Sequence, residues 1–138
     1  MMKKIISILC LMLSLGCLST KSSAEKVAWN FMDTYYVRTD PAAALPFTDR
    51  LAYEKVKQSV ELIKSVTSQP GETNTRPQVS ASIAAKNNNP SEEPFIFLVT
   101  IKPYESQEVQ KKVMVRVRQM ENQEWKVTQF SDEDVLKN

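Results

Sequence analysis

The chain has 138 residues, a formal net charge of +2, two cysteines and no histidine. Its length suits one domain with a single hydrophobic core. The near-neutral balance excludes general nucleic-acid binding, which depends on neutralising several phosphates. From Cys17 onward 16 basic residues face 16 acidic ones, so the excess positive charge lies at the N-terminus. The chain contains no nucleotide, metal or nucleophile motif, and we therefore expect neither a cofactor nor a metal site.

The N-terminal residues have the layout of a bacterial export signal. Lys3 and Lys4 precede an apolar run from Ile5 to Leu15, which is shorter than the roughly 20 residues of a membrane-spanning helix. This pattern predicts a removable signal peptide and a mature protein in the cell envelope. Both cysteines, Cys10 and Cys17, lie in or directly after this run, so no disulfide is expected in the folded domain.

Two cleavage sites are compatible with this signal. The stretch 13–17 resembles the lipobox of bacterial lipoproteins, and the resemblance implies acylation of Cys17 and anchoring to a membrane on its periplasmic side. The signal is then 1–16, followed by a tether at 17–24. The alternative is cleavage after Ala24, with a signal of 1–24 and a soluble periplasmic protein.

The first part of the domain has helical periodicity. Apolar residues recur at steps of three and four from Val27 to Tyr35, which predicts a helix over 25–37. Asp40 and Pro41 have the pattern of a capped helix start and predict a short second helix. Pro46 and Phe47 should interrupt that helix.

A third helix is predicted from a cap at Thr48 or Asp49 to about Thr67. The residues that this periodicity places on its inner face are Ala52, Val56, Ser59, Val60, Ile63 and Val66. A loop is predicted for residues 68–75, where Pro70 and Gly71 mark a turn.

The second part of the domain alternates with a period of two. Strands are predicted at 79–86, 95–103, 109–120 and 123–131, with the apolar strand at 95–103 in a central position. Helices followed by a strand meander predict an α+β fold in which the helices pack on one face of a four-stranded antiparallel sheet. The domain should span 25–131 and end in a polar tail at 132–138.

Part of this pattern resembles small bacterial domains of the nuclear-transport-factor-2-like superfamily, which has a cystatin-like fold. The resemblance rests on Phe31-x-x-x-Tyr35-Tyr36-Val37-x-x-Asp40-x-x-Ala43 and on Leu51-Ala52 at the start of an amphipathic helix. It implies a cone, in which a curved sheet wraps round the helices and leaves a pocket or groove at its open side. The chain departs from many members by having only Pro46-Phe47 where they have a strand or hairpin.

The resemblance does not select a function, because the superfamily includes isomerases, dehydratases, ligand binders, secretion-system assembly domains and dimerisation modules. The expected function is non-catalytic binding of an envelope protein or a small apolar ligand, and a homodimer is compatible with this. An accessory subunit of an envelope assembly is one alternative. Another is an isomerase- or hydrolase-type enzyme that uses Asp33, Tyr35, Tyr36 or Asp40, although adjacent helical positions should point the two tyrosines about 100° apart.

Two groups of residues are candidate sites. A pocket for a small apolar ligand would be lined by Trp29, Phe31, Met32, Tyr35, Phe47, Phe95 and Phe97, although the same residues could simply form the core. A partner-binding face would be formed by Lys112, Arg116 and Arg118, which share the polar side of the third strand, with Lys126 beside them. The alternative interpretation of this second group is an ordinary solvated sheet face. The acidic run at 132–134 is expected to be solvated as part of the tail.

Overall fold

The computed structural model describes residues 22–66, 76–85, 89–90 and 93–135. The predicted signal peptide, Cys17 and most of the tether lie outside these residues, as do the predicted loop at 68–75 and the last three residues of the tail. None of the described helices is both long enough and apolar enough to cross a bilayer.

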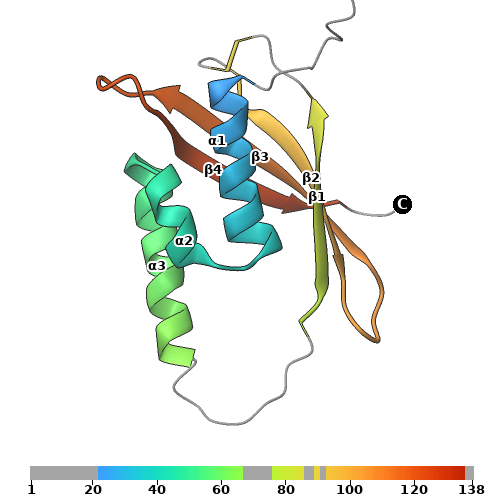
Figure 1. Cartoon of the computed structure of the whole chain (residues 1–138). Helices are drawn as coiled ribbons and strands as arrows, with labels where there is room; N and C mark the ends of the chain where they lie inside the picture. Colours follow the sequence, from blue (N-terminus) through green and yellow to red (C-terminus); the bar gives the residue numbers. More distant parts are fainter. Residues whose placement is uncertain (1–21, 67–75, 86–88, 91–92, 136–138) are drawn as a thin grey trace, which may run out of the picture.

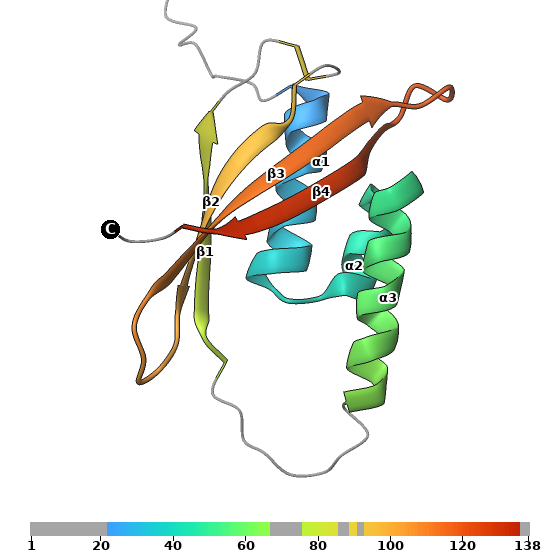
Figure 2. The same cartoon turned by 180° about the vertical axis from the view of Figure 1, so that it is seen from behind.

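The described residues form an α+β fold, as the sequence predicts. Three helices, two of which continue into a short π or 3-10 turn, pack on one face of a four-stranded antiparallel sheet (Figure 1). The helical segments are α1 Ser23–Met32, η1 Asp33–Val37, α2 Pro41–Ala44, η2 Leu45–Phe47 and α3 Arg50–Val66. The strands are β1 Gln78–Ala85, β2 Phe95–Lys102, β3 Val109–Gln119 and β4 Trp125–Asp134. No described helix lies on the opposite face of the sheet (Figure 2).

The helix predicted over 25–37 is α1 continued by η1. Ser22 caps it by accepting a hydrogen bond from the Glu25 amide at 3.2 Å. The last turn is a π-helix, in which the Arg38 amide donates to the Asp33 carbonyl five residues back at 2.8 Å. The chain then turns at Thr39, whose φ of 53° is unusual for a β-branched residue.

The predicted cap of the second helix, α2, is present. The Asp40 side chain accepts a hydrogen bond from the Ala43 amide at 3.0 Å, and Pro41 occupies the first turn of α2. Before α3 the chain is attached to the sheet, since the Asp49 amide donates to the Val127 carbonyl at 2.9 Å. The start of α3 is therefore fixed against β4.

The inner face of α3 is buried only in its N-terminal half. Ala52 and Val56 are fully buried, whereas Ile63 and Val66 are 45% and 71% exposed. The prediction that these last two residues face the core is wrong. The helical period is as predicted, but the C-terminal half of α3 extends past the sheet, and no described strand covers it (Figure 1).

The sheet is a simple meander in the order β1-β2-β3-β4. β2 and β3 are the interior strands, and Phe97 pairs with Val113 between them. The register between β3 and β4 shifts between Arg116 and Val117, because Thr128 forms a bulge. The last hairpin turns at residues 121–123, as predicted, with φ at +67° for Gln123.

The fourth strand is longer than predicted. The sequence places the end of the domain at Ser131, but β4 continues to Asp134, and Asp132 to Asp134 pair with Val113 to Lys111 of β3. The acidic run therefore belongs to the sheet and not to a tail, although its residues are exposed as expected. Two lysines on the neighbouring strand, Lys111 and Lys112, form ion pairs with it.

The hydrophobic core lies between α1 and the inner face of the sheet. α1 contributes Ala28, Phe31 and Met32, and the strands contribute alternating residues that are fully or almost fully buried. Those on the strands are Phe95, Phe97, Val99, Val113, Val115, Val117, Val127 and Phe130. On β1 the inward residues are only half-buried, since β1 forms an edge of the sheet.

Candidate functional site

The seven residues predicted to line an apolar pocket come together as part of the core. Phe31, Met32, Phe95 and Phe97 are buried, and Trp29, Tyr35 and Phe47 are half-buried against the same cluster. The Trp29 and Phe97 rings meet edge to face with their centroids 5.0 Å apart. The structure thus brings the predicted set together, and these side chains contact one another.

The rings of Tyr35 and Tyr36 contact each other. Their ring centroids are 5.0 Å apart, and both rings pack on Phe31 and on Phe130 of β4. Both residues belong to the π-helical turn η1, and their adjacent positions let the two large rings meet on the same side of β4. The two tyrosines therefore belong to one aromatic cluster between the helices and β4.

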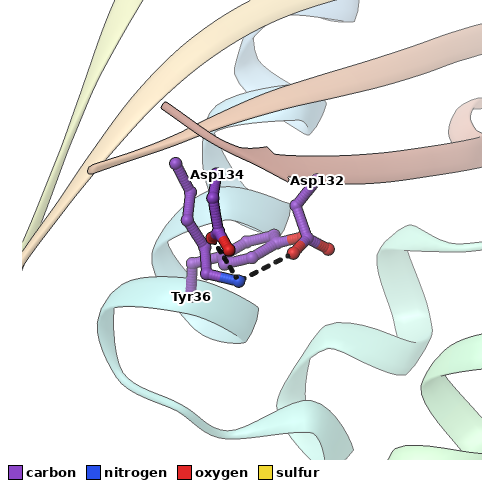
Figure 3. A network of polar contacts seen from close by, with 4 residues as sticks. Tyr36, Asp132 and Asp134 are labelled. Carbon is purple, nitrogen blue, oxygen red and sulfur yellow. Dashed lines mark hydrogen bonds and ion pairs between the residues drawn. The ribbon is translucent and has the colours of Figure 1, made fainter. Parts of the chain in front are cut away.

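The hydroxyl of Tyr36 belongs to a polar network at the end of β4. It donates a hydrogen bond to Asp132 Oδ1 at 3.2 Å, and Lys111 Nζ lies 3.2 Å from Asp132 Oδ2 and 3.3 Å from Asp134 Oδ1 (Figure 3). Burial, and then the negative charge of Asp132, raise the pKa of Tyr36 well above its ordinary value. The hydrogen bond to Asp132 also raises the pKa of Lys111, although burial opposes this. Tyr36 is therefore a hydrogen-bond donor at neutral pH and not a base.

This network predicts that the protein loses stability in alkali. Because the pKa values of Tyr36 and Lys111 are raised on folding, their stabilising contributions are complete below about pH 10 and are lost as the pH rises through the folded values. We expect the melting temperature to fall between pH 10 and pH 11, and to fall less in Tyr36→Phe. Tyr104→Phe is the matched control, because Tyr104 is 81% exposed and should follow the wild type. Superimposable curves for Tyr36→Phe and wild type would contradict this account.

The two aspartates considered for catalysis have other partners. Asp33 forms an ion pair with Arg38 on the exposed side of η1. Asp40 accepts the capping hydrogen bond at the start of α2. The structure does not bring either of them to Tyr36 as an acid–base pair.

The three residues of the predicted partner face do share one side of β3. Lys112, Arg116 and Arg118 alternate with buried valines, so they lie on the face of the sheet that no described helix covers. Lys112 forms an ion pair with Glu133 at 3.2 Å. Arg118 is exposed and forms no ion pair within the described part of the chain. We call the surface formed by these three residues the basic face. Lys126 was expected beside them, but its ammonium donates to the Pro46 carbonyl at 2.6 Å and pairs with Glu124 at 3.4 Å, so it does not belong to this face.

Apolar side chains adjoin these cations. Ile96 and Leu98 of β2 pair with Met114 and Lys112 of β3, and all four are half-buried, with no described helix over them. Beside them is a hollow of about 80 Å³. Its lining residues are Pro94, Met114, Arg116, Gln129, Phe130 and Ser131. This volume is several times the roughly 10–15 Å³ that one water needs, so the hollow can hold a single side chain.

Sequence reasoning located the cations of this surface but missed its apolar part. The signal was present, since Ile96, Leu98 and Thr100 alternate with the core residues of β2 and are too apolar for a fully solvated face. A pattern of this kind predicts a strand that is covered on both faces. In the structure, no described helix covers the face of the sheet that carries Ile96, Leu98 and Thr100.

No metal site is found among the described residues, which contain no suitable group of three or more aspartate, glutamate, cysteine or histidine side chains. No protein-family model matches the chain, no curated protein is significantly similar to it, and no solved structure matches its fold.

Proposed function

We propose that this chain is a non-catalytic binding domain of the cell envelope, exported by its N-terminal signal and anchored to a membrane through acylated Cys17. In this proposal the domain is of the nuclear-transport-factor-2-like kind and binds an acidic partner protein through the basic face. The order of the elements, three helices followed by a four-stranded meander, supports the family assignment.

The observation that carries the proposal is the composition of the basic face. An uncovered layer of half-buried Ile96, Leu98 and Met114 adjoins Arg116 and Arg118. A side-chain-sized hollow opens beside Met114 and Arg116. Protein interfaces commonly combine an apolar centre and a pocket for one anchoring side chain with a charged rim. Because the rim here is cationic, the complementary partner presents an apolar anchor flanked by aspartate or glutamate.

The other interpretations have weaker support. A small apolar ligand inside the cone would have to displace the side chains of the aromatic core, such as Phe31 and Phe97, which are fully buried. An acid–base enzyme would need a positioned carboxylate and an ionisable partner in one pocket. Asp33 and Asp40 are instead engaged in an ion pair and a helix cap.

The test is charge reversal on the basic face. The tagged full-length chain would be crosslinked in cells and purified from membranes, and its intact mass would also distinguish a start at acylated Cys17 from a start at Glu25. We expect a defined heterologous adduct in the wild type and at least a tenfold loss of that adduct in Arg116→Glu/Arg118→Glu.

The control carries the same change of charge elsewhere. Lys26→Glu/Lys57→Glu alters two exposed helical lysines and should keep the adduct at the wild-type level. Equal loss in both double variants would show a nonspecific charge effect and overturn the proposal. An adduct of twice the mass of the chain would assign the face to a second copy instead, and a start at Glu25 would exclude the lipid anchor.

A further inference from the structure

The helical side of the molecule carries a groove that is separate from the basic face. It lies between the η1–α2 connection, the C-terminal half of α3 and Arg76, which precedes β1, and its volume is about 430 Å³. This volume is within the usual range for small-molecule sites. Apolar side chains line one part of it, namely Pro41, Val60 and Ile63.

The charged lining of the groove is mainly cationic. Arg38, Lys64 and Arg76 line it, and among the described residues that line it Asp40 is the one carboxylate. Asp40 already accepts the hydrogen bond of the α2 cap. The ion pair between Arg38 and Asp33 lies at the exposed surface, where such pairs contribute little, so an incoming anion can share the Arg38 guanidinium.

The backbone at this rim has two irregular features. The π-helical turn η1 ends directly before Arg38, and Thr39 then adopts φ of 53°, which is costly for a β-branched residue. Together they direct the chain from η1 into α2, and Arg38 to Ala42 form one wall of the groove. Irregular backbone of this kind costs stability compared with regular structure, and it often occurs at functional sites.

The exposed position of Ile63 is consistent with a ligand. Ile63 is 45% exposed and follows Val60 on the same side of α3 at a three-residue spacing. Burial of both residues by the apolar part of a ligand would be favourable, since removing apolar surface from water gains about 25 cal/mol per Å². The C-terminal half of α3, which the sheet leaves uncovered, would then pack against the ligand.

We propose that this groove binds a small amphipathic anion. The acidic group of the ligand lies between Arg38 and Arg76, where guanidinium groups match a carboxylate, sulfonate or phosphate in geometry. Its apolar body lies on Val60 and Ile63. This site is on the helical side of the molecule and is independent of the basic face, so either proposal can fail without the other.

The experiment uses two dyes that differ in one charged group. The sulfonate dye 1-anilinonaphthalene-8-sulfonate and its uncharged analogue N-phenyl-1-naphthylamine would be titrated into the mature full-length protein and followed by fluorescence. We expect saturable binding of the sulfonate dye, at least tenfold weaker in Arg76→Glu and weaker again in Arg38→Glu/Arg76→Glu. The neutral dye should bind weakly, with no response to Arg76→Glu.

The control for charge is Lys57→Glu, an exposed position on α3 that does not line the groove. It should bind the sulfonate dye as the wild type does, and circular dichroism should show all variants folded. Equal weakening in Lys57→Glu, or unchanged binding in Arg76→Glu, would overturn the proposal. So would Arg76-dependent flotation with phosphatidylglycerol vesicles without saturable dye binding, because the cations would then recognise a lipid surface and not a free anion.

Discussion

Replacement of Phe31 by alanine is expected to lower the free energy of unfolding by about 3–5 kcal/mol. Phe31 is fully buried and holds the aromatic cluster together: its ring stacks on Tyr35 at 5.3 Å and meets Phe130 at 4.8 Å, both measured between centroids. The substitution removes these contacts and leaves a cavity between α1 and β4. Since domains of this size have a total stability of about 5–15 kcal/mol, the variant should be close to unfolding.

Urea unfolding monitored by tryptophan fluorescence measures this loss. Leu62→Ala is the control, because Leu62 is 67% exposed on the uncovered part of α3, and the expected change there is within about 0.5 kcal/mol. A loss below about 1 kcal/mol in Phe31→Ala would mean that the cluster is not the packed centre of the domain.

Replacement of Ala28 by leucine is expected to lower the free energy of unfolding by about 1–3 kcal/mol. Ala28 is fully buried on the face of α1 that meets the sheet. A densely packed core has no room for three additional carbon atoms without shifts of the backbone or strained rotamers. This substitution therefore distinguishes a core that is filled by its own side chains from one that contains an open pocket.

The same urea experiment measures this change. Ala43→Leu, at an exposed position on α2, is the control and should change the stability little. In an open pocket the new leucine would occupy free space, and the stability would stay constant or rise. That result would restore the interior ligand pocket to consideration and remove one support for binding at the outer surface.

The features predicted correctly from the sequence depend on local signals. The cap formed by Asp40 and Pro41 needs only residues within one turn, and it occurs as predicted. The alternation of β3 likewise placed Arg116 and Arg118 on one face without knowledge of the neighbouring strands. Steric and hydrogen-bonding requirements of this kind act over a few residues, and a single sequence contains them.

The features that were missed depend on contacts between distant residues. The charge of the acidic run at 132–134 predicts a polar tail. In the structure Lys111 and Lys112 lie opposite this run on β3, and their ion pairs with it favour a longer strand. The inner-face prediction for Ile63 assumed a layer to cover it, and the sheet ends before that point. The π-turn at Tyr35 and Tyr36 has no reliable sequence signature.

The groove could not be found from the sequence for the same reason. Arg38, Lys64 and Arg76 come from three separate segments, and nothing in their spacing suggests that they meet. Their convergence depends on the irregular backbone at Thr39 and on the projection of α3 past the sheet. A charged site assembled in this way becomes visible only when the elements are placed in space.

Site-specific photocrosslinking in living cells tests most directly whether the basic face is a binding surface. A benzophenone amino acid would replace Gln129, an exposed residue beside the hollow, so that Arg116 and Arg118 stay intact. The matched control position is Gln58, which is exposed on α3. The account predicts one defined adduct from position 129 that disappears with Arg116→Glu/Arg118→Glu, and none from position 58. No adduct from position 129, or the same adducts from both positions, would contradict it.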